Sequence, residues 1–147
     1  MLCPDEIYER KLQLVEAIIG NGTTWLRDLR HMGTRLFGSR FAGAFASDKI
    51  PVLTNETPYA IVNVDKSSEP GSHWVALAKN GSVTLFYDSF GRRGSNLIPA
   101  VCVSGNGRIV DVERDAEQRI LEANCGARCL EGFWVFDDFG PEAAATV

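Results

Sequence analysis

The 147-residue chain has few of the features that mark several common classes of protein. Its four cysteines, Cys3, Cys102, Cys125 and Cys129, are too few for a disulfide-rich secreted scaffold, so we expect reduced thiols. No apolar run approaches the roughly 20 residues that a membrane-spanning helix needs. The first residues lack the basic region and apolar stretch of a secretory signal. We therefore expect a soluble protein that is made inside a cell, is not secreted and has no membrane partner.

The chain also lacks an excess of basic residues. Lys and Arg number 15 against 19 Asp and Glu, which gives a net charge of −4 at pH 7 and no general basic footprint for nucleic acid. The scattered arginines of the second half are typical of solvated surface, and a local nucleic-acid site stays an open alternative. No repeat or linker divides the chain. Residues 1–147 are therefore predicted to form one domain, with a frayed tail over about 141–147.

Helical periodicity is found at the two ends of the chain. An amphipathic helix is predicted over residues 5–19, and a second one begins at residue 23 or 24 and continues through about residue 37. A final helix is expected to follow Asn124, a good N-cap, and to end at Gly140-Pro141. Residues 38–58 are rich in glycine and small side chains and are predicted to be a loop.

Strand-like sequence fills the middle of the chain. The β-branched and apolar runs that predict strands are residues 59–64, 73–78, 83–87 and 108–112. Residues 96–107 give no clear signal for helix or strand.

Asn80-Gly81 separates two of these runs and is the strongest short signal for a two-residue hairpin, with positive φ at both turn positions. This turn would place Leu77 opposite Thr84 and His73 directly opposite Asp88, with Cβ atoms about 4.5–5.5 Å apart. The carboxylate would raise the pKa of the imidazole and select its tautomer, which suits a catalytic base and also occurs at purely structural sites. Both faces of the hairpin are apolar, so we expect it in the centre of a sheet covered on both sides.

Cys125 lies at the predicted start of the last helix, where the partial positive charge favours a thiolate and the backbone N–H is free for an oxyanion. Gly126 leaves room for a substrate to approach closely. A small core residue is the other interpretation of Cys125, and it is the one we adopt for Cys129, one helical turn later. Gln118, seven residues before Cys125, has an amide that can bind an oxyanion without titrating, although most glutamines are surface residues.

Together these residues resemble the adenoviral-type (adenain-like) maturation cysteine proteases of double-stranded DNA viruses, which are related to the proteases that process SUMO. The shared pattern is His73-Trp74 on one strand, Asp88 on the next, then Gln118, six intervening residues and Cys125-Gly126. The resemblance covers roughly residues 23–137.

The resemblance implies a papain-like α+β fold, with helices packed on a central mixed sheet and the nucleophile at the N-terminus of a buried helix. His73 would accept the proton of Cys125, Asp88 would orient His73, and Gln118 would help the Cys125 backbone N–H to bind the oxyanion. These four residues are the candidate catalytic set.

The implied activity is a cysteine endopeptidase that cleaves viral capsid or core precursor proteins at glycine-containing sites during virion maturation. Trp74 and Gly126 would contact the substrate, and no metal or other cofactor is required for the chemistry. The partners would be viral structural polypeptides. The location would be the virion and the infected cell, in the nucleus or a cytoplasmic virus factory. Adenoviral enzymes are activated by DNA and by a disulfide-linked peptide; here the strand near Ile109 has no cysteine, and Cys102 lies upstream.

Two other classes of function stay open. A protease that removes SUMO or a similar modifier would use the same catalytic residues and differ only in substrate. A non-enzymatic binding domain or zinc site could use Cys125, Cys129 and His73 as ligands, but the spacing matches no metal-binding signature.

Overall fold

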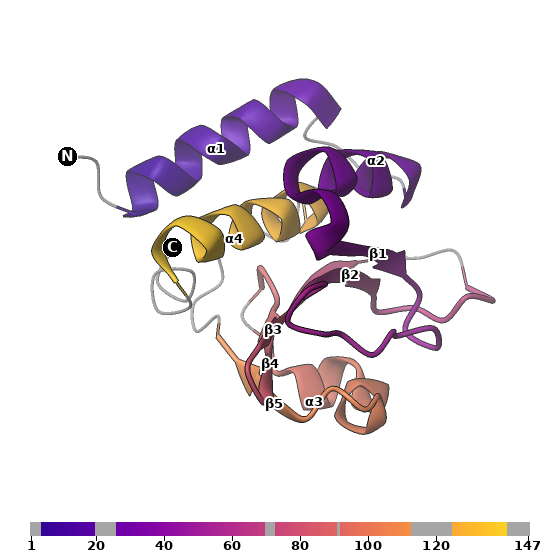
Figure 1. The fold of residues 1–147 in the computed structure, drawn as a ribbon. Coiled ribbons are helices and arrows are strands. Elements are labelled where there is room, and N and C mark those ends of the chain that lie inside the picture. Colours follow the sequence, from indigo (N-terminus) through magenta and orange to yellow (C-terminus); the bar gives the residue numbers. More distant parts are fainter. Residues whose placement is uncertain (1–3, 20–25, 70–72, 91, 113–124, 141–147) are drawn as a thin grey trace.

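The computed structural model describes residues 4–19, 26–69, 73–90, 92–112 and 125–140. These form one β-sheet between two layers of helix (Figure 1). The three long helices α1, α2 and α4 lie on one face of the sheet, and the short helical segments α3 and η2 lie on the other. None of the helices in these ranges combines the length and apolar character that crossing a membrane requires.

The elements have the following bounds. The helices are α1 (Pro4–Ile19), α2 (Leu26–Phe37), α3 (Gly94–Leu97) and α4 (Cys125–Phe139), with 3-10 turns η1 (Gly38–Arg40) and η2 (Pro99–Val103). The strands are β1 (Phe41–Phe45), β2 (Tyr59–Asn63), β3 (Trp74–Asn80), β4 (Val83–Tyr87) and β5 (Arg108–Asp111). The predicted helix starts at residues 23–24, the N-cap Asn124 and the tail 141–147 lie outside the described residues.

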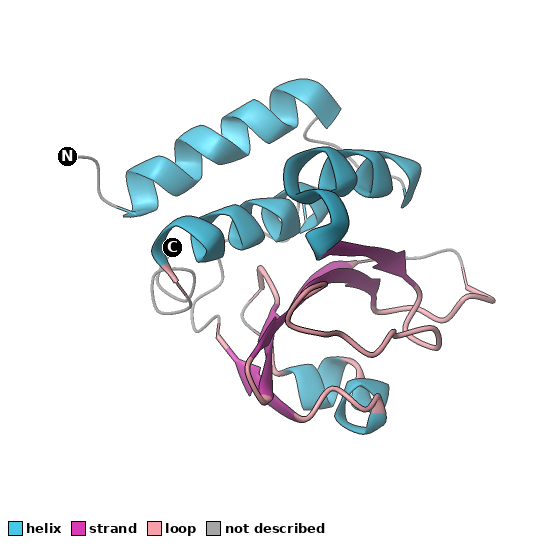
Figure 2. Ribbon diagram, in the orientation of Figure 1, coloured by secondary structure: helices cyan, strands magenta, loops and turns pink. Residues whose placement is uncertain are grey.

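The sheet is mixed, with the strand order β1-β2-β3-β4-β5 (Figure 2). The two inner pairings, β2 with β3 and β3 with β4, are antiparallel, whereas β1 and β5 run parallel to their neighbours. The predicted α+β class with a central mixed sheet is therefore confirmed for the described residues.

The sheet separates two apolar cores, which confirms the two-sided pattern predicted for the hairpin. Ala76 and Tyr87 face the long helices, where they pack with residues such as Phe133 of α4. Leu77 and Phe86 face the opposite layer and pack with residues such as Ile98 and Val101. Because β3 and β4 are covered on both sides, polar residues next to the ends of these strands, such as His73 and Asp88, are buried as well.

The hairpin register differs from the prediction by two residues. The turn is Gly81-Ser82, so Asn80 remains in β3 opposite Val83 and Leu77 pairs with Phe86, not with Thr84. Gly81 has a φ of +63°, and among the described residues only glycines have positive φ, which fits a turn with glycine at its first central position. A shift of two residues leaves every side chain on its predicted face. His73 and Asp88 are consequently not directly opposed; both lie just beyond the ends of β3 and β4.

The segment predicted as the loop 38–58 contains η1 and the strand β1, which the prediction missed. β1 has the sequence Phe-Ala-Gly-Ala-Phe and lacks β-branched residues, so its local preference for a strand is weak. Pairing with β2 decides its conformation, across an irregularity between Phe41 and Gly43, where Gly43 has a φ of +135°. The ambiguous residues 96–107 contain part of α3 and all of η2.

Helix α4 lies between the sheet and α1 (Figure 1), and its first nine residues are all buried. Its C-terminus is held by Asp137, which binds Arg40 through both guanidinium Nη atoms at 2.8 and 3.0 Å and also bonds Tyr59. Gly140 ends the helix with a φ of +86°, and its N–H donates to the carbonyl of Phe136 at 2.8 Å. These contacts attach the C-terminal end of the helix to η1 and β2; its other end begins at Cys125.

Candidate active site

Cys125 is the first residue of α4, and its thiol points toward the start of β3. The backbone N–H of Trp74 donates to Cys125 Sγ at 3.4 Å, and the N–H of Gly126 bonds the same sulfur. Only 7% of Cys125 is exposed to solvent. Two backbone donors and a helix N-terminus therefore favour the anionic form of a sulfur whose burial would otherwise disfavour it.

His73 immediately precedes β3, where the N–H of Val64 donates to its carbonyl at 2.9 Å and fixes the backbone. Its Nε2 lies 2.6 Å from Asp88 Oδ1, and its side chain also hydrogen-bonds Cys125. The predicted contact of His73 with Asp88 is thus confirmed, although the register that was expected to produce it is not. With Nε2 engaged by the carboxylate, Nδ1 is the nitrogen left to exchange a proton with the thiol.

Asp88 follows β4, and its side chain has no exposed surface. Apart from His73, it accepts hydrogen bonds from the backbone N–H groups of Phe90 at 3.3 Å and Arg92 at 3.0 Å. The Arg92 side chain adds Nε at 2.8 Å and Nη2 at 3.5 Å. A buried carboxylate with this many donors is held as an anion in one orientation.

The pKa values of these groups shift in the directions that a nucleophile and its base require. Burial alone raises the pKa of Cys125, but the hydrogen bond to His73 and those from the backbone of Trp74 and Gly126 bring it below its ordinary value. Burial alone lowers the pKa of His73, but its bonds to Asp88 and Cys125 raise it above its ordinary value. For Asp88, burial opposes ionisation, and the bonds from His73 and Arg92 outweigh it and lower the pKa to about 2. Both Cys125 and His73 therefore move toward a thiolate–imidazolium pair.

Two of the remaining predicted site residues are described and one is not. Trp74 is partly buried, and its indole packs against the core on the α4 side of the sheet, while its backbone N–H donates to Cys125. Gly126 is buried beside Cys125. Gln118 lies outside the described residues, as do residues 70–72, which precede His73.

Arg92 and Phe90 are the neighbours of the site that the sequence analysis missed. Arg92 binds Asp88, and its guanidinium carbon lies 5.0 Å from the centre of the Phe90 ring. The Phe90 ring in turn lies 5.0 Å from the His73 ring. The available signal was the spacing of four residues between Asp88 and Arg92 in a turn-rich stretch, which allows an arginine to fold back on a carboxylate.

The other described cysteines differ sharply from Cys125. Cys129 is buried, and burial together with the nearby Cys125 and Asp88 raises its pKa well above the ordinary value, so the core interpretation of Cys129 is confirmed. Cys102 is exposed and lines a hollow of about 190 Å³ beside β5. All three thiols are free. Within the described ranges no group of three or more His, Cys, Asp or Glu side chains is arranged to hold a metal ion.

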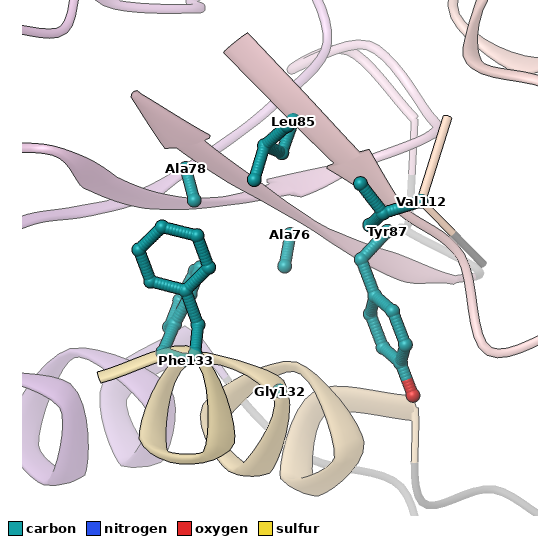
Figure 3. A pocket seen from close by; sticks show the side chains of 8 residues that line it. Ala76, Ala78, Leu85, Tyr87, Val112, Gly132 and Phe133 are labelled. Carbon is teal, nitrogen blue, oxygen red and sulfur yellow. The ribbon is translucent and has the colours of Figure 1, made fainter. Parts of the chain in front are cut away.

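A small cavity of about 20 Å³ lies between α4 and the sheet, two turns along the helix from Cys125 (Figure 3). Its walls are apolar and include Ala76, Tyr87, Gly132 and Phe133. This volume is close to that of a methyl group or a single water, so it is a packing defect and does not hold a substrate.

No model of a known protein family matches the chain, and a search of curated proteins finds no significant relative. We therefore infer a function from the residues of the site and their geometry.

Proposed function

We propose that the protein is a cysteine endopeptidase in which Cys125 is the nucleophile and His73 is its general base and acid. The observation that carries this proposal is the meeting of Cys125, His73 and Asp88, from α4 and from the ends of β3 and β4, in one buried network. Thiol, imidazole and carboxylate connected in this order form the arrangement that activates a cysteine for acyl transfer.

The geometry supports the following sequence of steps. The Cys125 thiolate attacks the carbonyl carbon of the scissile peptide, and the oxyanion that forms is bound by backbone N–H groups at the start of α4. Protonated His73 gives its Nδ1 proton to the leaving amine as the C–N bond breaks, which leaves a thioester on Cys125. His73 then takes a proton from water, the hydroxide attacks the thioester, and the carboxylic acid is released with the thiolate restored. Asp88 remains ionised and stabilises the imidazolium throughout.

For the substrate, we propose viral capsid or core precursor proteins that are cut at glycine-containing sites, and a location in the virion and the infected cell. The support is the order and spacing of His73, Asp88, Gln118 and Cys125, which resemble the adenoviral-type maturation proteases. We place Gln118 in the oxyanion site on the same resemblance. Cleavage of glycine-containing precursor peptides, with SUMO conjugates left intact, would support this substrate class; the reverse preference would favour the deconjugating alternative.

The resemblance also implies a peptide or DNA activator, although the proposed chemistry needs no cofactor. β5 contains no cysteine, and Cys102 is the exposed thiol among the described residues, in the hollow beside that strand. If a peptide joins the protein through a disulfide, Cys102 is the expected attachment point. A cysteine-containing peptide that raises activity equally in the Cys102→Ser variant would reject this attachment.

The direct test of the enzymatic proposal is the Cys125→Ala variant, with Cys129→Ala as its matched control on the same helix. We expect Cys125→Ala to abolish peptidase activity while leaving the unfolding temperature nearly unchanged, because alanine removes only the sulfur. We expect Cys129→Ala to retain substantial activity, because the buried thiol has no part in the reaction. Activity in the Cys125 variant equal to that of the unmodified protein would reject the proposal.

A further inference from the structure

A single carboxylate, Asp88, is shared between two cationic partners, His73 on Oδ1 and Arg92 mainly on Oδ2. Oδ1 also accepts the backbone N–H of Phe90 at 3.3 Å and a longer contact from Arg92 Nη2 at 3.5 Å. Oδ1 lies 2.6 Å from His73 Nε2, whereas Oδ2 accepts the Arg92 Nε at 2.8 Å and the Arg92 backbone N–H at 3.0 Å. A carboxylate rotates about its bond to Cβ unless both oxygens are engaged, and rotation would remove Oδ1 from the imidazole. The bonds that Arg92 donates to Oδ2 therefore help to keep Oδ1 in hydrogen-bonding position for His73 Nε2.

Arg92 forms this contact from a different environment than Asp88. The Arg92 side chain is 46% exposed, whereas the Asp88 side chain has no exposed surface. A half-exposed ion pair contributes little to folding stability because water and salt screen it. Its fixed geometry is the more important property, since the guanidinium lies against Phe90 and Phe90 lies against the ring of His73.

We propose that Arg92 is a positioning residue for the Cys125–His73 pair, because its guanidinium holds the Asp88 carboxylate in the rotation that presents Oδ1 to His73 Nε2. The guanidinium also packs on the Phe90 ring, which in turn packs on the imidazole of His73. Its consequence for turnover depends on the proposed peptidase function, but its effect on the thiol of Cys125 does not.

The titratable and charged groups that face Asp88 are few in the described part of the chain. They are His73 from the start of β3, Arg92 from its own loop and Cys129 from α4, with Cys125 on the far side of His73. A positioning role and a simple charge effect differ in what they predict for His73 and for Arg92→Lys. If Arg92 acted only as a positive charge, its removal would raise the pKa of both His73 and Cys125, and Arg92→Lys would restore both in full. If Arg92 positions Asp88, its removal weakens the bond to His73, so the pKa of Cys125 rises while that of His73 falls, and Arg92→Lys restores them only in part.

The test is the pH dependence of iodoacetamide alkylation at Cys125, followed by mass mapping of the labelled cysteine from about pH 4 to 9. In Arg92→Ala we expect the apparent pKa of Cys125 to rise by roughly half a unit or more. Arg92→Lys should recover part of this shift, because an ammonium can contact Oδ2 but cannot reproduce the planar fork. Arg93→Ala, which removes the same charge from the exposed neighbouring position, should leave the pKa of Cys125 unchanged.

The kcat and KM for peptide hydrolysis by the same variants give a second, independent test. We expect Arg92→Ala to lower kcat several-fold with little change in KM, since the proposed role acts on His73 through Asp88 and not on substrate binding. An unchanged or lower pKa of Cys125 in a folded Arg92→Ala protein would overturn the positioning role, and so would full recovery of the pKa in Arg92→Lys. The Lys variant decides the matter if the Ala variant does not fold. Absence of any peptidase activity, with the pKa shift present, would reject the proposed function and leave the role of Arg92 in place.

Discussion

The two ends of the β3–β4 hairpin each bury a polar network, and the networks are built in different ways. At the turn end, the Asn106 amide accepts the N–H of Leu53 at 2.7 Å and donates to the Pro51 carbonyl and to Ser104 Oγ, both at 2.9 Å. The backbone carbonyl of Asn106 accepts a hydrogen bond from the Thr84 hydroxyl at 2.7 Å. This network joins a loop to the sheet through groups that do not titrate at moderate pH.

At the open end, the network consists of an acid, a base and a thiol that change one another's pKa. His73, Asp88 and Cys125 are buried, as Asn106 is, but each of the three can exist in two protonation states. Buried polar groups whose hydrogen bonds are all made give a fold a fixed structure. Buried titratable groups that are coupled to one another have shifted pKa values, which suit them to proton transfer. The difference supports our proposal that the open end carries out the reaction, while the turn end stabilises the fold.

The largest expected effect is the loss of activity in His73→Ala. Without the imidazole, Cys125 loses the partner that lowers its pKa and the acid that protonates the leaving amine, so kcat/KM should fall by about 10³-fold or more. The matched control is His31→Ala, which alters the exposed histidine of α2 and should retain full activity. Steady-state peptide hydrolysis measures both, and equal rates for the two variants would remove His73 from the reaction.

The second effect concerns stability at the opposite end. Asn106→Ala leaves the Leu53 N–H and the Pro51 carbonyl without their partner and should lower the free energy of unfolding by about 3 kcal/mol. Asn96→Ala, at an exposed position, should change it by less than about 0.5 kcal/mol. Urea denaturation gives both values. A loss of kcat in the folded fraction of Asn106→Ala would show that the two ends are coupled and would break the comparison.

The third effect is a loss of stability at low pH that is caused by protonation of Asp88. Its pKa is lowered in the folded state to about 2, so its contribution is present above the ordinary value of 3.8 and is lost as pH falls toward 2. The contribution is about 2 kcal/mol. In Asp88→Asn this part of the acid destabilisation should be absent. Unfolding free energies measured from about pH 5 to 2 test this, and parallel curves for the two proteins would contradict it.

The smallest effect is a gain of stability from Gly132→Ala in the middle of α4. The added Cβ would lie 3.7 Å from the Tyr87 ring, an ordinary contact, and would fill part of the small cavity in Figure 3. We expect a gain of about 0.5–1 kcal/mol. By contrast, the Cβ of Gly94→Ala would lie 2.7 Å from the Phe86 ring and should destabilise the protein. Thermal unfolding of the two variants should therefore shift in opposite directions.

Local sequence patterns predicted most of the sheet but not every pairing in it. The alternation of apolar residues placed both faces of β3 and β4 correctly, because a register error of two residues preserves the face. The turn was misassigned because Asn80-Gly81 and Gly81-Ser82 are both acceptable hairpin turns, and pairing over the whole strand decides between them. β1 was missed because its pairing with β2, and not its own composition, makes it a strand.

The site was predictable where the chain itself brings residues together. His73 and Asp88 flank the two strands of one hairpin at its open end, and Cys125 starts a helix whose boundary is visible in the sequence. Arg92 was not predictable in the same way, because its contact with Asp88 depends on the path of the loop after β4. In the sequence, Arg92 therefore resembles the other scattered arginines, and only the fold of the loop distinguishes it from them.

The central claim is that Cys125 is a low-pKa nucleophile held by His73 and Asp88. Its most direct test is competitive alkylation of the native protein near pH 6.5 with a limiting thiol reagent, followed by mapping of the modified cysteines. We predict that Cys125 reacts before the exposed Cys102, that Cys129 stays unmodified, and that the preference for Cys125 disappears in His73→Ala. Preferential modification of Cys102, or a Cys125 reactivity that is independent of His73, would contradict it.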